Sequence, residues 1–176
     1  MIGVLALQGD FLEHEQVLGV LKLPFKEVRS LADTEGLTGF IIPGGESTVM
    51  DLFMGQFGLK EWLVKKVAGD ANFAVLGTCA GLILLARYGL LNVTVERNAY
   101  GRQIASFTAN VQVEGVGELE GHFIRAPKIT QVGTKALVLG EWEGNPVAVR
   151  QGRVWGISFH PEVAGSSALH AAVFSC

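Results

Sequence analysis

The stretch Ala74-Val-Leu-Gly-Thr-Cys-Ala-Gly-Leu-Ile-Leu-Leu-Ala86 decides the fold of this 176-residue chain. One apolar run ends at Gly77, a cysteine follows two residues later, and a second apolar run of helical length begins after Gly81. This order predicts a buried strand, a sharp turn and a helix start, with the thiol of Cys79 at the turn. Such a turn leaves backbone N–H groups free beside the thiol, and these groups and the helix dipole lower a thiol pKa from about 8.5. Cys79 is therefore a candidate nucleophile.

The candidate partners of Cys79 lie far away in the chain, in Phe159-His-Pro-Glu162. In an extended segment, residues i and i+2 face the same side, and Pro161 biases His160 towards extended geometry. Glu162 can then orient the His160 imidazole while the other ring nitrogen faces the cysteine. A cysteine with a distant histidine and acid is the pattern expected of a cysteine nucleophile. The alternatives are a cysteine that packs as a small core hydrophobe and a surface histidine beside a solvated glutamate.

Composition narrows the classes of function. Hydrophobic residues make up 49% of the chain and charged residues 18%, which argues for a packed core rather than disorder. The formal net charge is −3 and no Lys/Arg cluster stands out, so nucleic acid is not an expected partner. Two cysteines do not make a disulfide framework and favour a reducing cytoplasm. No apolar run reaches the roughly 20 residues that span a membrane. We expect one cytoplasmic domain over residues 1–176 and no membrane segment.

The first half of the chain predicts strands and helices in alternation. The expected strands are near-continuous apolar runs at Ile2–Leu7 (a first strand rather than a signal peptide), Phe25–Val28, Gly39–Ile42 and Ala74–Gly77. The expected helices have apolar residues at helical spacing and cover Phe11–Leu23, a segment from near Val49, Leu59–Ala68 and a segment ending at Tyr88. Strand, helix and strand in this order imply parallel pairing through right-handed crossovers.

The second half predicts antiparallel structure. Short strand-like runs follow one another at Leu91–Val95, Ile104–Val113, Gly121–Arg125, Ala136–Glu141 and Pro146–Arg150. Val154–Phe159 is a final apolar strand that places His160 at its end, and Ser166 or Ser167 caps a last helix to about Phe174. We therefore expect an α/β fold of three layers, with a mostly parallel sheet flanked by helices and an added antiparallel ribbon.

The segment Pro43-Gly-Gly-Glu-Ser-Thr48 ends the third expected strand. Its two adjacent glycines let the backbone take positive φ and approach a ligand, and Ser47 or Thr48 can cap the following helix. The segment is either an ordinary strand-to-helix connection or a loop whose N–H groups bind an oxyanion or a carboxylate. In open α/β sheets ligands bind beyond the carboxyl ends of the strands, so this loop, Cys79 and His160 are expected to converge.

These residues carry a family resemblance. Gly77–Gly81 together with Phe159–Glu162 resembles the class I (triad) glutamine amidotransferases, whose fold is flavodoxin-like. Longer motifs resemble, more narrowly, the glutaminase subunits of pyridoxal 5′-phosphate synthase. These motifs are Leu7–Asp10 with Glu13 and His14, Pro43–Thr48, Arg97–Gln103, and Phe123–Pro127. The resemblance covers nearly the whole chain.

The resemblance implies hydrolysis of L-glutamine to glutamate and ammonia, without a metal or a cofactor. The ammonia would pass to a (β/α)₈-barrel synthase subunit, in a large hetero-oligomer, that builds pyridoxal phosphate. By position, Cys79 is the nucleophile, His160 is the general base and then the acid, and Glu162 holds the imidazole. The N–H groups of Gly45 and Ala80 would form the oxyanion hole.

The resemblance also implies a substrate-binding set, which consists of Gly45, Glu46, Ser47, Arg97, Ile124 and Arg125. An arginine is the suitable anchor for the α-carboxylate of glutamine, and the sequence does not show whether Arg97 or Arg125 fills this role. Gln8 and His14 are implied to contact the synthase subunit, whereas His122 and His170 are expected to be surface or packing residues. One departure stands out, since Tyr88 alone connects Arg87 to Gly89 where the family has a longer loop.

Three other functions compete with this interpretation. The chain could be the triad glutaminase of another synthase, such as imidazole glycerol phosphate synthase, and the Arg97–Gln103 motif argues against that. It could be a stand-alone cysteine hydrolase acting on esters or peptides. It could also be a non-catalytic binding subunit, and the complete set of Cys79, His160 and Glu162 argues against that.

Overall fold

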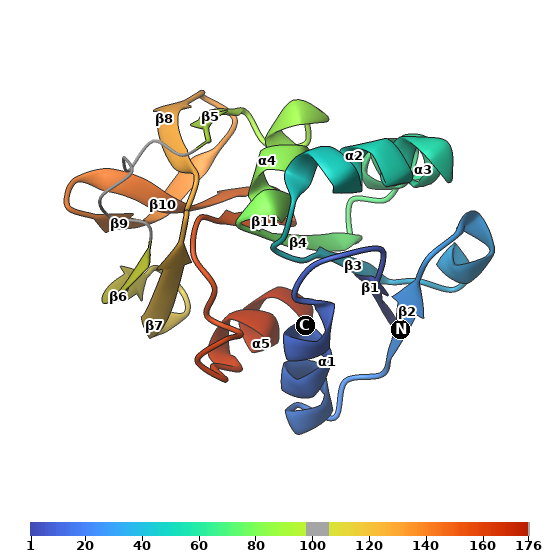
Figure 1. Cartoon of the computed structure of the whole chain (residues 1–176), viewed down its shortest axis with the longest axis horizontal. Coiled ribbons are helices and arrows are strands. Elements are labelled where there is room, and N and C mark those ends of the chain that lie inside the picture. The colour runs from blue at the N-terminus through green and yellow to red at the C-terminus, as the bar shows by residue number, and fades with distance from the viewer. Residues whose placement is uncertain (98–105, 176) are drawn as a thin grey trace.

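The computed structural model describes residues 1–97 and 106–175, which form layers of helices on both faces of a central sheet (Figure 1). In this part of the chain the sheet has seven strands in the order β2-β1-β3-β4-β11-β10-β9. Its strands are β1 (Ile2–Leu5), β2 (Phe25–Val28), β3 (Gly39–Ile42), β4 (Ala74–Thr78), β9 (Leu137–Trp142), β10 (Asn145–Gln151) and β11 (Val154–Ile157). The pairings from β2 through β11 are parallel, and β10 and β9 add an antiparallel edge. The predicted mostly parallel α/β sheet is confirmed.

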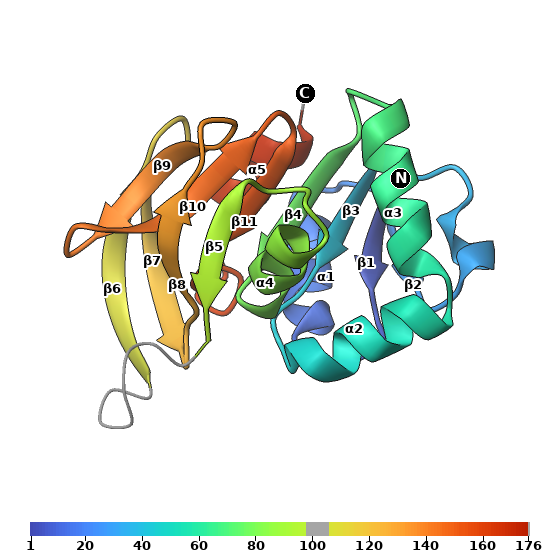
Figure 2. The ribbon, with the colours of Figure 1, turned by 90° about the horizontal axis from the view of Figure 1, so that it is seen from above.

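The helices divide between the two faces of this sheet (Figure 2). One face carries α2 (Ser47–Gln56), α3 (Leu59–Gly69) and α4 (Ala80–Arg87), and the opposite face carries α1 (Phe11–Val20) and α5 (Ala168–Phe174). A short 3₁₀ turn, η1 (Leu31–Thr34), follows β2. Each face has its own apolar core, with Met50 and Leu63 fully buried in the first and Leu18 and Leu169 fully buried in the second. Within the described ranges, no helix is both long and apolar enough to cross a bilayer.

The antiparallel addition is larger than the single ribbon expected from the sequence. In the described residues it consists of two separate ribbons, one pairing β5 (Val93–Glu96) with β8 (Lys128–Val132) and one pairing β6 (Ser106–Val113) with β7 (Gly117–Ile124). Ile129 of the first ribbon packs into the core under α2–α4, and Phe123 of the second packs into the core under α1 and α5. The ribbons therefore extend both faces of the sheet.

Some boundaries differ from the sequence predictions. The strand β8 was not predicted, because only Ile129 in it is buried and its partner β5 is more than 30 residues away. The helix α2 begins at Ser47, so neither Ser47 nor Thr48 is its cap; the cap is Glu46, whose carboxylate accepts the Thr48 N–H at 3.1 Å. Ser167 does precede α5, but its side chain makes no capping hydrogen bond.

The short connection after α4 closes as a Schellman motif. Gly89 has φ = 72°, and its N–H donates to the Ala86 carbonyl while the Leu90 N–H donates to the Leu85 carbonyl. These bonds satisfy the last carbonyls of the helix, which a glycine in the left-handed region permits. The chain therefore passes from Arg87 to Gly89 through Tyr88 without a longer loop.

Candidate active site

Cys79 sits at the turn between β4 and α4 in a strained conformation, with φ = 49° and ψ = −100°. A residue other than glycine in this region costs about 1–3 kcal/mol. The turn is held because the Cys79 N–H donates to the Ile157 carbonyl at 2.8 Å, and because Gly81 has no Cβ to strike the Ile42 carbonyl. The thiol is free and the residue is 8% exposed. The predicted strand, turn and helix around this cysteine are confirmed.

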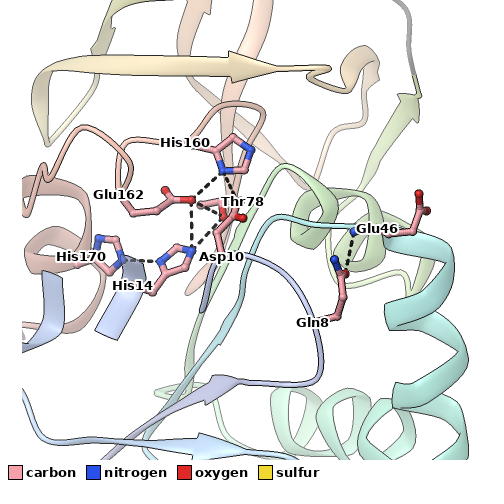
Figure 3. Close-up of polar contacts among 8 residues, drawn as sticks. All are labelled: Gln8, Asp10, His14, Glu46, Thr78, His160, Glu162 and His170. Atoms are coloured by element: carbon pink, nitrogen blue, oxygen red, sulfur yellow. Dashed lines mark hydrogen bonds and ion pairs between the residues drawn. The ribbon is translucent and has the colours of Figure 1, made fainter. Parts of the chain in front are cut away.

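His160 follows β11, and its Nδ1–H donates to Glu162 Oε1 at 2.9 Å (Figure 3). Both side chains are buried. The backbone of His160 is extended, since its N–H donates to the His122 carbonyl at 2.9 Å and its carbonyl accepts the His122 N–H in an isolated bridge to β7. The predicted orientation of Glu162 towards the imidazole is therefore confirmed.

Asp10 is a second carboxylate on the same imidazole. Its Oδ2 lies 3.1 Å from His160 Nδ1, and its side chain is 36% exposed. The position is set by backbone, because the Asp10 N–H donates to the Gly44 carbonyl at 3.1 Å and Gly44 has no Cβ to strike the imidazole. Asp10 belongs to the Leu7–Asp10 motif but is not among the predicted site residues; its place in the loop between β1 and α1, at the carboxyl edge of the sheet, is the signal that marks it.

The two carboxylates and the thiol determine the charge of His160. Burial alone works against an imidazolium, but hydrogen bonds to Asp10, Cys79 and Glu162 outweigh it and raise the pKa of His160 to about 12. The hydrogen bond to His160 in turn lowers the pKa of Asp10. Because the pKa of His160 lies well above 7, the imidazole is protonated at neutral pH. Its Nδ1 faces the two carboxylates, so Nε2 is the nitrogen left for the Cys79 sulfur.

Two adjoining cavities open beside Cys79. The larger, of about 300 Å³, is lined by Gln8, Asp10, Gly45, Glu46, Cys79, Ile124, Arg125 and His160. The smaller, of about 160 Å³, shares five of these residues and adds Ser47, Ile83, Arg97 and Pro127. All six residues predicted to bind substrate thus line one space with the thiol. The combined volume of the two cavities suits a small polar molecule.

The predicted binding residues differ in what they offer to that space. The Arg97 guanidinium donates to Thr48 Oγ1 at 2.8 Å. Arg125 leaves β7 with φ = 44°, another positive φ at a residue other than glycine. Ser47 is buried in the first turn of α2. The rest of the Arg97–Gln103 motif, residues 98–103, lies outside the described residues.

The backbone around the Gly45 loop is held by Gln8. The Glu46 N–H donates to Gln8 Oε1 at 2.8 Å, and a Cβ on Gly45 would strike the same side chain (Figure 3). Gly45 has φ = 147° and lines both cavities. Ala80, the other residue predicted for the oxyanion hole, is the buried first residue of α4 and lines neither of these two cavities.

One group of side chains in the described part of the chain has the composition of a metal site. Ligand atoms of Asp10, His160 and Glu162 lie within 4.8 Å of one another. Both carboxylates, however, lie at hydrogen-bond distances from the same nitrogen, His160 Nδ1. A metal would need the lone pair of that nitrogen at about 2.0–2.1 Å. The geometry fits a shared proton instead.

The prediction that His14 contacts a partner protein is wrong. His14 is fully buried, because it lies on the face of α1 that turns towards the sheet, and it bonds to Thr78 and His170. His170 is likewise fully buried, whereas the His122 side chain is partly exposed beside Glu120. Gln8 bonds to Glu46 and lines the cavity, so its contact with a partner stays a prediction.

The fold and the site define a class of α/β proteins in which a cysteine at a strand-to-helix turn faces a histidine–carboxylate pair. Among solved structures, one described as a glutamine amidotransferase superposes with a TM-score of 0.95 at 42% identity, covering 99% of this chain and 97% of the other. The structure of PurLQS from Thermotoga maritima shares the fold at 13% identity, with a TM-score of 0.77 over 99% of this chain and 96% of the other.

The sequence profile of the SNO glutamine amidotransferase family matches residues 4–174, so the chain belongs to that family. A relative from Thermus thermophilus is 45% identical over 180 residues, covering 97% of this chain and 94% of the relative. Another from Clavibacter sepedonicus is 46% identical over 184 residues, covering 97% and 87%. Both relatives are named pyridoxal 5′-phosphate synthase subunit PdxT.

Proposed function

We propose that this chain hydrolyses L-glutamine and supplies the ammonia to a pyridoxal 5′-phosphate synthase. The observation that carries the proposal is the convergence of the Cys79 thiol and the bonded His160–Glu162 pair on a space lined by two arginines. The names of relatives with 45–46% identity support the choice of synthase over the other glutaminases and the stand-alone hydrolases. The reaction needs no metal or cofactor, since thiol, imidazole and water supply every step.

The first half of the reaction transfers the γ-glutamyl group to Cys79. The thiolate is the nucleophilic form of a cysteine, and the neighbouring His160 imidazole, which carries a proton, is the acid. The thiolate attacks the side-chain amide carbon, and the N–H groups of Gly45 and Ala80 receive the oxyanion; losing one such donor costs about 3 kcal/mol. His160 Nε2–H then protonates the departing nitrogen. Ammonia leaves, and the γ-glutamyl group remains on Cys79 as a thioester.

The second half releases glutamate. The imidazole, now neutral, takes a proton from water as the water attacks the thioester carbon. Collapse of this second intermediate expels the Cys79 thiolate and restores the imidazolium. Glu162 accepts the His160 Nδ1–H and stabilises the charged ring, while Asp10 adds a second carboxylate at the same nitrogen.

Two oppositely charged groups bind the amino-acid end of the substrate. A guanidinium of Arg97 or Arg125 pairs with the α-carboxylate, because planar bidentate pairing favours arginine there. The Glu46 carboxylate, at the rim of both cavities, offers the complementary charge for the α-ammonium group. Ile124 covers the methylene chain between the two ends.

The ammonia passes directly to a (β/α)₈-barrel synthase subunit within a large hetero-oligomer. We place the complex in the cytoplasm, where a nucleophilic thiol stays reduced.

The test is the release of glutamate and ammonia from L-glutamine, measured with and without the synthase subunit. We expect the subunit to stimulate release and Cys79→Ala to abolish it, with the complex still formed. Cys176→Ala, which removes the other cysteine of the chain, is the matched control and should keep activity. L-Asparagine, one methylene shorter, should be a poor substrate. No release by wild-type protein in a confirmed complex would refute the proposal.

A further inference from the structure

A second polar cluster is buried beside Glu162. It consists of His14 on α1, Thr78 at the end of β4 and His170 on α5, all fully buried (Figure 3). None of the three lines either cavity, so none is placed to touch a substrate there. Polar side chains at this depth cost free energy unless each finds a partner. The cluster therefore needs a reason beyond packing.

The hydrogen bonds of this cluster form one chain that ends on Glu162. His170 Nε2 lies 2.8 Å from His14 Nδ1, and His14 Nε2 lies 3.2 Å from Thr78 Oγ1 and 3.4 Å from Glu162 Oε1. The Thr78 hydroxyl donates to Glu162 Oε1 at 3.2 Å. The same oxygen accepts from His160 Nδ1. Three groups thus converge on one carboxylate oxygen.

The Glu162 carboxylate, as the final acceptor, fixes the direction of donation along the whole hydrogen-bond chain. An ionised carboxylate only accepts, and the Thr78 hydroxyl uses its proton on it, so His14 Nε2 must carry a hydrogen. His14 Nδ1 then accepts, and His170 Nε2 must donate to it. His170 Nδ1 is left as a bare lone pair, and that atom is buried without a partner among the described residues. The unpartnered atom is the one that this direction requires.

His14 and His170 both stay neutral, as this direction of the hydrogen-bond chain requires. Burial, aided by the nearby His170 and His160, holds the pKa of His14 well below its usual range. Burial also lowers the pKa of His170 to about 4. Glu162 Oε2 has no partner among the described residues, so its carboxylate depends on the donors at Oε1.

We propose that His14 and His170 are positioning residues, which hold Glu162 on the His160 imidazole through a directed chain whose last link is the Thr78 hydroxyl. The proposal rests on the proposed function, in which His160 is the acid–base group and Glu162 its partner. The helices α1 and α5 thereby help to set the charge state of a histidine that belongs to neither helix. The titratable groups that act on His14 are His170, His160 and Glu162, and those that act on His160 are Asp10, Cys79 and Glu162.

The first test reads the tautomers directly and does not depend on turnover. Imidazole ¹⁵N NMR of the full-length wild-type protein should show His14 and His170 both neutral and both protonated at Nε2 between pH 6 and 8. His160 should be cationic over the same range. A His14 protonated at Nδ1, or a cationic His14 at pH 7, would overturn the proposal even if glutaminase activity is normal.

The second test measures kcat, KM and the pH profile of glutamine hydrolysis in the complex with the synthase subunit. His170→Phe removes the donor to His14, so His14 can switch tautomer and turn a lone pair towards Glu162. We expect kcat to fall about 10- to 100-fold, the range known for outer partners of metal-binding histidines, with KM unchanged. The alkaline limb of kcat/KM should move to lower pH, because Glu162 then stabilises the His160 imidazolium less well.

Two further variants separate positioning from packing. His170→Gln keeps an N–H donor near the same place and should restore kcat and the pH profile in large part. Val173→Ala removes buried volume from the same helix and should lower the Tm without moving the alkaline limb. Equal pH limbs in wild type, His170→Phe and His170→Gln would refute the proposal. If His170→Phe does not fold, Thr78→Val against Thr78→Ser makes the same comparison one link later.

Discussion

The backbone strain at Cys79 predicts that, of two inactive variants, Cys79→Gly is more stable than Cys79→Ala. This is the reverse of the usual order of glycine and alanine. Cys79→Ala and Cys79→Gly both lack the thiol and differ only by a Cβ at φ = 49°, ψ = −100°. Relief of this conformation favours glycine by about 1–3 kcal/mol. The greater freedom of glycine in the unfolded chain opposes it by about 0.4–1 kcal/mol. The glycine variant should therefore be more stable by about 1 kcal/mol.

For a chain of this length, a difference of 1 kcal/mol corresponds to about 2–4 °C in Tm. The assay is urea denaturation of both variants, supported by calorimetry. The pair Ala86 and Ala86→Gly is the matched control, because this position lies within α4 and glycine there should cost about 0.5–1 kcal/mol. A Cys79→Ala protein as stable as Cys79→Gly, or more stable, would show that the turn stores no more than about 1 kcal/mol of strain, which contradicts the reasoning.

Three other predictions concern the groups around His160 and the substrate. Asp10→Asn replaces a carboxylate that favours the imidazolium by a neutral amide, so it should lower the pKa of His160 below its value of about 12, as followed by NMR titration; an unchanged titration would contradict the shared hydrogen bond. Gly44→Ala places a methyl group against the His160 imidazole. A displacement of the ring by about 1 Å should lower kcat about 100-fold, while the circular dichroism spectrum stays native. Full activity of this variant would rule out the close packing of Gly44 on the ring. Arg97→Ala and Arg125→Ala test the carboxylate anchor, and the true anchor should raise KM for glutamine about 10- to 100-fold with a smaller change in kcat; two unchanged KM values would exclude both residues.

Features encoded in adjacent residues were predictable from the sequence. The turn at Cys79 follows from one apolar run, two glycines and a second apolar run, all within 13 residues. The pairing of His160 with Glu162 follows from extended backbone across a proline. Such patterns need no knowledge of distant contacts, because the physics that sets them acts over a few residues.

Features that depend on distant contacts were not predictable. His14 and His170 are 156 residues apart, and nothing local in either helix indicates that the two rings meet. The Asp10 carboxylate reaches His160 only because β1 and β11 end at the same edge of the sheet. Glu46 caps α2 in place of the expected serine or threonine because Ser47 is already within the helix and buried. In each case the tertiary arrangement decides the role.

The isolated bridge between His122 and His160 has a mechanical consequence. The strand β7 that supplies this bridge continues into Ile124 and Arg125, two of the residues that line the cavity. A small displacement of the β6–β7 hairpin therefore carries the backbone of the imidazole and that of the cavity wall in the same direction. The spacing between the two changes less than the position of either one. The hairpin therefore couples the position of the imidazole backbone to that of the cavity wall.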